Sequence, residues 1–517
     1  MSLRRTALLH HAFFSAVPGH ALTPGSPVRQ ALERTWRRVG DLGFDRRLQS
    51  AWPAELPPPE AGLLRPGVKI LAARGASDDP GWNQAFAYQL DDTVGVSVLR
   101  GLPGPAAAWT ALTERWESPD GPGLSETDPP TGVFGLATVL LGLVPAEDWD
   151  RLSAPSATGA TALGAELADE LGLSPGTDAW SSSWFRPKEN ILGWELPASG
   201  VPGTRRVLVV APETAEVELL HWLWSGPRPG LPVFTGYLRH AAQLRYQYRI
   251  LTENLQGIRK SIQEVDSGCR YLARMLDQDQ LPVDRILAVE STLGQLQLRE
   301  GGVIARLADI RGMTHAVKTA RRNMVAMLGP LAPDDSGGPL HHDSELAQWT
   351  LEQLEAEQVF LSSAMTKATE IGRISSVVVA GRLAERRENL FLFQTSLVGS
   401  LLMVLAGIQS LQYDVDLPGP LLAPVIALLG ALALFLPSSV LHWRRRTPRP
   451  DRWARLDLFF AGCVGASLGW LAATGFHLLS HDAAAPPPVS VLSALAGTPL
   501  AMFLFDRFRQ IMDRRTK

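Results

Sequence analysis

The stretch LFLFQTSLVGSLLMVLAGIQSL, Leu390–Leu411, decides how the chain is organised. It contains no Lys, Arg, Asp or Glu, and it is long enough to cross the hydrocarbon core of a bilayer, which takes roughly 20 apolar residues. Backbone N–H and C=O groups must be bonded internally in lipid, so such a run is predicted to be a helix. Three more apolar runs follow it: Leu421–Leu441, Leu456–Leu479 and Val489–Phe505, the last of which is short and contains Pro499. We therefore expect a four-helix transmembrane region over residues 390–505.

Basic residues occur only in those flanks and connections of the runs that would lie on one side of the membrane. The connections Gln412–Pro420 and Ser480–Pro488 contain Asp but no Lys or Arg, whereas the other flanks are rich in Arg. Because basic loops stay in the cytoplasm, we expect a multi-pass protein of the inner membrane with both termini in the cytoplasm, including a basic tail over residues 506–517. The residues expected to anchor this topology are Arg386, Arg387, Arg444, Arg445, Arg446, Arg507 and Arg509.

Composition and motifs exclude several functional classes. The net charge is −3 over 517 residues, so no nucleic-acid partner is expected. The two cysteines, Cys269 and Cys463, exclude a disulfide framework and a cysteine-based zinc site. The sequence has no phosphate loop, zinc-protease motif or nucleophile elbow. We therefore expect no catalytic residues, no cofactor, no metal and no enzymatic activity.

The first 145 residues read as an α/β domain in the cytoplasm. Arg4 and Arg5 precede an apolar run, Ala7–Val17, as in a signal peptide, but His10 and His11 interrupt the run and favour a strand. Its apolar part, Leu8–Val17, begins an order that we interpret as β-α-β-β-α-β, a ferredoxin-like split unit. The other expected elements are a helix around Val28–Val39, strands at Val68–Arg74, Asn83–Leu90 and Thr93–Leu102, a helix at Pro105–Trp116, and a strand at Phe134–Val144.

Residues 146–231 form a second α/β unit or an extension of the first sheet. The pattern predicts helices at Ala160–Leu171 and Val217–Trp224. It predicts strands at Ile191–Leu196 and Arg205–Ala211. The Trp side chains of the soluble part, such as Trp36 and Trp222, are expected mainly in cores, although Trp is also enriched at protein interfaces.

From residue 237 to 389 the apolar period becomes that of a coiled coil. Apolar residues recur at spacings of four and three from Leu244 to Leu276, and again from Ile286 to Leu328. A third helix begins near Asp343 and runs into the first apolar run. We expect an antiparallel three-helix coiled-coil stalk whose third helix continues into the membrane. This apolar seam is compatible with bundling of helices within one chain or between copies of the chain. The sequence therefore does not decide whether the chain forms a homo-oligomer.

Small residues line one face of the third apolar run, every fourth residue: Ala461, Gly465, Gly469 and Ala473. This spacing lets helix backbones approach closely in lipid. We interpret it as a packing seam for membrane helices, within the chain or between copies. The middle of each span lacks ionisable residues, which argues against a secondary transporter because coupled-ion sites need them.

Two histidine pairs are the remaining candidates for a site. His10 and His11 are neighbours in a predicted strand and point to opposite faces, so they cannot share a ligand. His341, His342 and Asp343 lie in a predicted loop and have the chemistry of metal ligands, but solvated histidines are the more common outcome there.

The order of elements resembles that of the caspase- and TPR-repeat-associated (CATRA) proteins of actinobacterial conflict systems. The resemblance is carried by the opening strand and helix (Ala7–Phe44), by Trp194-Glu195-Leu196-Pro197, and by Tyr237–Leu251 leading into helices and spans. It implies a membrane-linked component of a defence system, with a caspase-like peptidase or an NTP-dependent regulator as partner. It carries no catalytic residues.

The topology is also similar to that of CorA-type magnesium channels, where a long cytoplasmic helix enters the first span. The chain departs from that family because Gln409–Asp416 stands where a Gly-Met-Asn motif belongs, and because four spans exceed two. Our leading hypothesis is thus a membrane-anchored sensor or scaffold that contacts lipid and binds a cytoplasmic protein through its first domain. The alternative is a stalk-gated pore or a membrane-disrupting effector.

Overall fold

The computed structural model describes residues 3–15, 25–58, 67–76, 82–102, 133–152, 157–170, 183–197, 204–225, 230–278, 282–328, 338–413, 418–444, 451–481 and 485–515. The chain forms two compact units. The first combines Met1–Tyr271 with Ser291–Glu370 and contains the sheet. The second combines Leu272–Glu290 with Ile371–Lys517 and contains the apolar helices.

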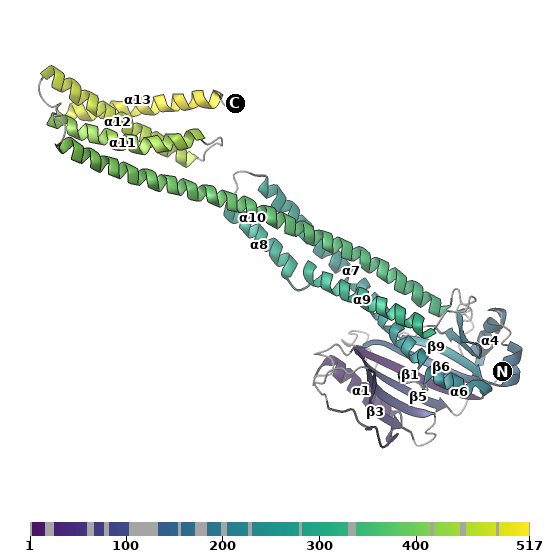
Figure 1. The fold of residues 1–517 in the computed structure, drawn as a ribbon. Coiled ribbons are helices and arrows are strands. Elements are labelled where there is room, and N and C mark those ends of the chain that lie inside the picture. The colour runs from purple at the N-terminus through teal and green to yellow at the C-terminus, as the bar shows by residue number, and fades with distance from the viewer. Residues whose placement is uncertain are drawn as a thin grey trace. The chain divides into compact units, whose positions relative to one another are not determined.

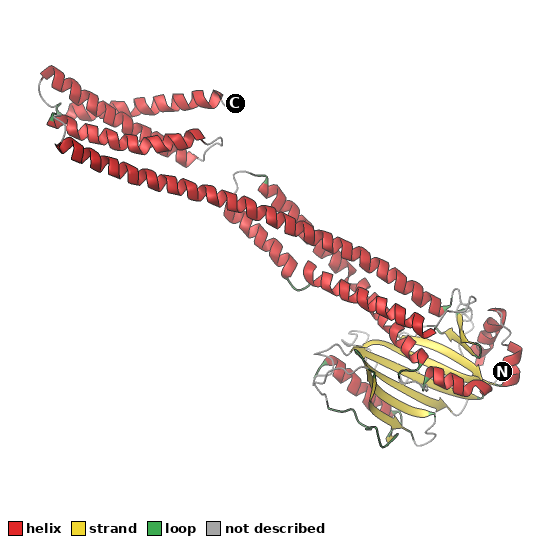
Figure 2. Ribbon diagram, in the orientation of Figure 1, coloured by secondary structure: helices red, strands yellow, loops and turns green. Residues whose placement is uncertain are grey.

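One nine-stranded sheet forms the centre of the first unit (Figure 2). Its strand order is β2-β3-β4-β5-β1-β6-β9-β8-β7. All neighbouring strands pair antiparallel except β6 and β9, which are parallel. The strands are β1 (Arg5–Ser15), β2 (Arg46–Arg47), β3 (Val68–Gly75), β4 (Asn83–Leu90), β5 (Thr93–Leu102), β6 (Val133–Val144), β7 (Trp184–Lys188), β8 (Ile191–Glu195) and β9 (Thr204–Pro212).

The central strand β1 is the apolar run that resembled a signal peptide. It pairs with β5 on one side and β6 on the other. Because β5 is antiparallel to both β1 and β4, these two strands are parallel to each other with β5 between them. This is a split β-α-β unit, and its helix is α1 (Pro27–Asp41). The strands β2 and β3 extend it at one edge, so that β3, β4 and β5 stand where the interpreted order β-α-β-β-α-β has two strands. The helix predicted at Pro105–Trp116 lies outside the described residues.

The strands of residues 146–231 extend the same sheet instead of forming a separate one. The parallel pairing of β9 with β6 makes this connection. Before β9, the chain forms α3 (Ala146–Leu152), α4 (Ala157–Glu170), β7 and β8. After it come a short 3-10 helix, Glu213–Ala215, and α6 (Glu216–Leu223). Neither α3 nor β7 was predicted.

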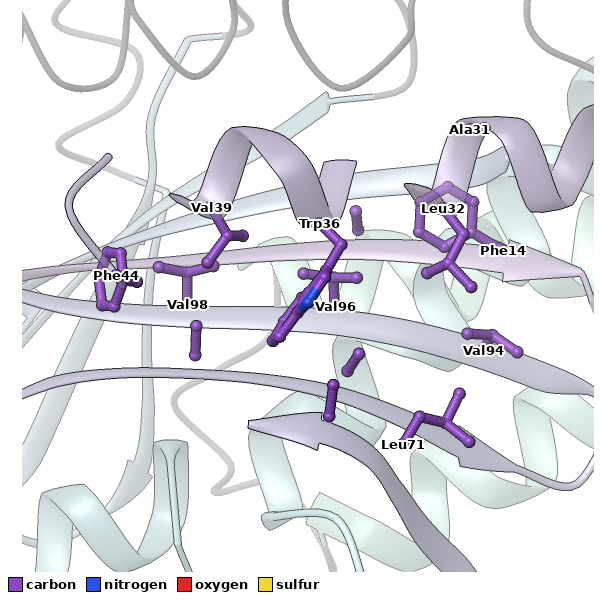
Figure 3. Packing of buried hydrophobic residues seen from close by; sticks show 14 of the residues in the cluster. Phe14, Ala31, Leu32, Trp36, Val39, Phe44, Leu71, Val94, Val96 and Val98 are labelled. Carbon is purple, nitrogen blue, oxygen red and sulfur yellow. The ribbon is translucent and has the colours of Figure 1, made fainter. Parts of the chain in front are cut away.

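The helix α1 buries its apolar side on one face of the sheet. Figure 3 shows Leu32 and Trp36 of α1 directed toward Val96 and its neighbours on β5. Ser26 caps the helix by accepting a hydrogen bond from the N–H of Arg29 at 3.1 Å, which satisfies one of the free donors at the helix start. A second cluster on this face includes Trp194 with Leu163 and Leu167 of α4. The expectation that Trp fills cores holds for Trp36 and Trp222, which are buried; Trp109 and Trp116 lie outside the described residues.

The first turns of α7 (Val233–Leu276) pack on the other face of the sheet (Figure 1). The long helices α8 (Val283–Leu298), α9 (Val303–Leu328) and α10 (Pro339–Tyr413) follow α7 in the chain. Phe134 of β6 packs against Tyr246 of α7, with ring centroids 6.4 Å apart. Salt bridges then join α9 to α10 (Lys318–Glu355, 2.9 Å) and α7 to α10 (Arg259–Glu357, 3.2 Å).

The directions of these helices agree with the predicted antiparallel arrangement. Successive contacts from Tyr237–Asp343 to Arg259–Glu357 rise together along α7 and α10, so these two helices are parallel. Contacts between α7 and α9 run the other way, from His240–Asn323 to Ser261–Arg306. A series of buried residues on α10 recurs at alternating spacings of four and three: Asp343, Ala347, Thr350, Leu354, Glu357, Leu361, Ala364 and Ala368.

The second predicted helix of the stalk is not continuous, which corrects the interpretation of Ile286–Leu328 as one element. It breaks between α8 and α9, where Gly301 has a φ of +71°, a conformation that L side chains rarely adopt. At Gly302 an added Cβ would lie 2.6 Å from the carbonyl oxygen of Gln297. Arg306 donates to the carbonyl of Gly301 at 2.8 Å and so holds the turn.

The second unit contains the apolar helices. The helix α10 runs without interruption into the first apolar run, as predicted. It is followed by α11 (Gly419–Arg444), α12 (Asp451–His481) and α13 (Pro487–Arg515). Of the described helices, α10, α12 and α13 are long and apolar enough to cross a membrane, and α11 has a shorter apolar stretch, Gly419–Phe435. The run that contains Pro499 is thus part of a helix of sufficient length.

Glycines bring α12 and α13 into backbone contact. A Cβ added at Gly465 would lie 2.4 Å from the carbonyl oxygen of Gly497. One turn further, a Cβ at Gly469 would lie 2.3 Å from the carbonyl oxygen of Ser493. Both positions therefore require the absence of a side chain.

We predict that Gly465→Val destabilises the packing of α12 on α13, because its side chain would overlap the backbone of α13. The matched control is Gly475→Val on the same helix, where an added Cβ meets no atom within 4 Å. Thermal unfolding of the full-length protein in detergent should show a lower Tm for Gly465→Val than for Gly475→Val. Equal Tm values would contradict the close approach of the two helices.

Candidate functional site: a buried charge cluster between sheet and helices

Five polar side chains meet where the sheet touches the long helices, and we call them the junction cluster. Glu195 ends β8 and Arg205 lies at the start of β9. Tyr237 and Arg245 come from the first turns of α7, and Asp343 from the start of α10. Asp343 is only 2% exposed and Arg205 only 6%. Charged side chains buried to this degree need partners.

Asp343 is the centre of the cluster. Its Oδ2 accepts hydrogen bonds from Arg205 Nη1 and from Tyr237 Oη, each at 2.5 Å. Its Oδ1 accepts from Arg245 Nη2 at 2.8 Å. Both carboxylate oxygens are thus bonded to donors on two other elements, β9 and α7.

Glu195 supplies the second negative charge. Its Oε2 accepts from Arg205 Nη2 at 3.1 Å, and its Oε1 accepts from Arg245 at 3.3 Å. Two carboxylates therefore balance two guanidinium groups. The Arg205 guanidinium also lies 5.8 Å from the centre of the Tyr237 ring, a cation–π distance.

The pKa values reflect this balance of burial and charge. Burial alone would raise the pKa of Asp343, but Arg205, Arg245 and the Tyr237 hydroxyl hold it below its usual value. Burial would lower the pKa of Arg205, yet Asp343 and Glu195 outweigh it and raise that pKa. Burial and the negative charge of Asp343 raise the pKa of Tyr237. Asp343, Arg205 and Tyr237 are therefore fixed in their ordinary charge states at neutral pH.

The cluster can hold elements together, and its groups are arranged for that role. Every carboxylate in it is engaged by guanidinium donors, so neither is free to accept a proton from a substrate. The residues joined are far apart in sequence: 138 positions separate Arg205 from Asp343. The cluster thus clamps β8, β9, α7 and α10 at one point.

Comparison with known domain families now identifies the chain. The CASPASE and TPR Repeat-Associated N-terminal domain matches residues 7–226, and the C-terminal domain of the same name matches residues 232–368. The chain belongs to the CATRA family. The comparison with curated proteins gives no match.

The junction cluster connects the two CATRA domains. Glu195 and Arg205 lie in the N-terminal domain, whereas Tyr237, Arg245 and Asp343 lie in the C-terminal domain. The C-terminal match ends at residue 368, close to the end of the first compact unit at Glu370. The apolar helices lie beyond the matched residues.

The junction cluster was not predicted from the sequence, although the sequence contains signals for it. Arg205 opens a strand whose core is Val207–Val210, and Asp343 takes a position of the heptad pattern. Charged residues at positions that a pattern assigns to the interior need a partner. Two segments that carried the family resemblance, Trp194–Pro197 and Tyr237–Leu251, contain three members of the cluster.

The structure corrects the interpretation of the second histidine pair. His341, His342 and Asp343 lie in the first turns of α10 and not in a loop, because Pro339 starts the helix there, a position that suits proline. Asp343 is fully engaged by Arg205 and Arg245, and His341 lies 3.3 Å from Glu345. Among the described residues, no three His, Cys, Asp or Glu side chains are grouped as metal ligands.

The other residues singled out from the sequence lie in the second unit. Ala461 is buried and Ala473 half-buried on α12, the helix that carries Gly465 and Gly469. Arg386 and Arg387 are exposed on α10 before its apolar part. Arg507 lies over the ring of Phe503 at 5.8 Å. Arg444 ends α11 and Arg509 lies in α13, whereas Arg445 and Arg446 are outside the described residues.

The first histidine pair is buried in the sheet, with one residue facing each side as predicted. His10 Nδ1 lies 3.2 Å from Thr138 Oγ1, and His11 Nδ1 lies 2.7 Å from Ser97 Oγ. Burial lowers the pKa of His11 to about 3. On α7, burial lowers the pKa of His240 to about 4. These rings are neutral in the folded protein.

We predict that Asp343→Asn destabilises the CATRA domains by about 3–5 kcal/mol, because it leaves the buried Arg205 and the half-buried Arg245 with Glu195 as their only carboxylate. The exposed Glu345→Gln on the same helix is the control. The double variant Asp343→Leu with Arg205→Met removes both charges and should recover part of the loss. Thermal unfolding followed by circular dichroism measures the effect, and a Tm for Asp343→Asn equal to that of the control would contradict the clamp.

We also predict that acidification from pH 6 to pH 4.5 destabilises the protein. The unfolded histidine has a pKa near 6.5, whereas the pKa of folded His11 is about 3. The unfolded state therefore binds more protons as the pH falls, which lowers the free energy of unfolding by about 1.4 kcal/mol per pH unit for such a histidine. The stability from Asp343 is lost only below pH about 4, since its pKa is lowered.

His11→Asn should reduce this pH dependence, whereas the exposed His342→Asn should not. Urea titrations of the full-length protein at several pH values measure the slope. An unchanged slope in His11→Asn would show that His11 does not titrate in this way.

Proposed function

We propose that this CATRA protein is a membrane-anchored sensor or scaffold of a bacterial conflict system, and that it is not an enzyme. Its sheet domain would bind a cytoplasmic protein, its long helices would act as a coiled-coil stalk, and its apolar helices would hold it in the inner membrane. The stalk would transmit a signal or assemble copies of the chain.

One observation carries this proposal: the helix α10. Its first turns are clamped to the sheet through Asp343, and its last third is the apolar run Leu390–Leu411. A helix without a break connects the two, so a change at the sheet has a continuous element along which to act.

Membrane attachment is supported by the apolar surface of the second unit. Many large apolar side chains of α10, α12 and α13 are exposed there, including Phe391, Leu402, Phe476 and Leu492. An exposed apolar surface of this extent is typical of a site that contacts a membrane or another protein. The distribution of Arg around the apolar runs favours cytoplasmic termini.

A protein partner is supported by the family. Its description links these domains to caspases and TPR repeats. A caspase-like peptidase or an NTP-dependent regulator is therefore the partner that we propose for the sheet domain. The junction cluster contains no nucleophile and no free acid or base, which supports a binding role over catalysis.

The topology can be tested with single cysteines. With Cys269 and Cys463 replaced by Ser, we expect Ser480→Cys to react with a membrane-impermeant maleimide on intact cells, and Arg387→Cys to react only after lysis. The reason is that Ser480 lies in the acidic connection predicted outside and Arg387 in the basic flank predicted inside. Labelling of Arg387→Cys on intact cells, or recovery of the protein in the supernatant after centrifugation without detergent, would overturn the proposal.

The rival function is a stalk-gated pore or a membrane-disrupting effector. The purified protein in liposomes separates the two functions. An anchor leaves the liposomes sealed to ions, whereas a steady leak would favour the pore.

A further inference from the structure

A groove lies between α9 and α10 in the first unit. Its volume is about 370 Å³ and it is open to solvent. Such a volume is at the lower end of what ligand sites provide. It is lined by Lys318, Arg321, Arg322, Val325 and Leu351.

The basic side of the groove carries charge that the chain does not balance. Lys318 pairs with Glu355 at 2.9 Å. For Arg321 and Arg322, no ion pair is formed with any carboxylate of the described residues. From Arg311 to Leu328 the sequence contains four Lys or Arg and no Asp or Glu. Two guanidinium groups therefore face the groove without a partner on their own helix.

The groove also offers an apolar surface beside these charges. Val325 is 57% exposed and lies one turn after Arg321 and Arg322 on α9. Leu351 of α10 is buried and contributes the apolar lining from the opposite helix. A ligand that fits must combine negative charge with an apolar group.

The acid that could compete from within the chain is Glu352, next to Leu351 on α10. Gln348 donates to its Oε1 at 3.1 Å, and neither arginine of the groove bonds to it. An arginine presents a planar set of donors that suits carboxylates. Because the groove is open to solvent, it suits a segment of polypeptide better than an enclosed small molecule.

We propose that this groove is a docking site for an acidic segment of a partner protein, with carboxylates on Arg321 and Arg322 and an apolar side chain against Val325 and Leu351. This deepens the proposed scaffold function and rests on it, since it adds a second contact surface on the helices to the one proposed on the sheet domain.

The test uses the full-length protein in detergent and a short fluorescent peptide of glutamates with one central leucine. Fluorescence anisotropy should show binding that weakens with added salt, because exposed charges are screened. The double variant Arg321→Glu with Arg322→Glu should bind more than about tenfold more weakly, since like charges then face each other. Glu352→Gln should bind at least as tightly as the wild type.

Arg311→Glu is the matched control, because Arg311 is exposed on the same helix but does not line the groove. It should bind as the wild type does. Equal weakening by Arg311→Glu and the double variant would show general charge attraction and overturn the site. So would binding of the corresponding lysine peptide, or displacement of the glutamate peptide by inorganic phosphate, which would indicate a small-anion site.

Circular dichroism of each variant checks that the helices are intact. If the peptide does not bind but the maleimide labelling matches the predicted topology, the docking site in the groove is refuted and the membrane scaffold is not. Intact peptide binding with the reverse topology would refute the scaffold and leave the groove.

Discussion

The carboxylate of Asp343 sets the register of the helices in the CATRA domains. It belongs to the buried series of α10, and it is the position at which Arg205, Arg245 and Tyr237 meet. If α10 slid by one heptad, Thr350 would take its place, and the buried Arg205 and the half-buried Arg245 would share Glu195 as their only carboxylate in the cluster. Removing one partner of a buried ion pair costs several kcal/mol, so alternative registers are strongly disfavoured.

A second buried acid repeats this arrangement two heptads later. Glu357 is 1% exposed and accepts hydrogen bonds from Arg259 of α7 and from Gln353. Between the two acids the series contains Leu354 and the small residues Ala347 and Thr350. Apolar positions supply most of the burial, but they tolerate a heptad shift. The buried acids do not tolerate such a shift. Fixing the register is the role best established for polar residues in such seams.

The elements that could be predicted from the sequence are those that the residues of a single segment determine. Long apolar runs define the end of α10 and most of α12, and short apolar runs of strand length define β1 and β9. The break at Gly301 was missed because apolar spacing continues on both sides of it. The pairing of β9 with β6 and the junction cluster were missed for a different reason. Both depend on residues more than 60 positions apart, and periodicity within one segment says nothing about which segments meet.

The two compact units fix their helices by different physical means. In the unit that holds the CATRA domains, apolar burial in water drives association but specifies position poorly, so buried acids such as Asp343 provide the specificity. Around α12 and α13 a lipid solvent would remove that driving force, because lipid tails are as apolar as the side chains. Close approach of backbones at Gly465 and Gly469 then has to provide both attraction and position. The change from buried charges to glycines along one chain is therefore what a change of solvent, from water to bilayer, would demand.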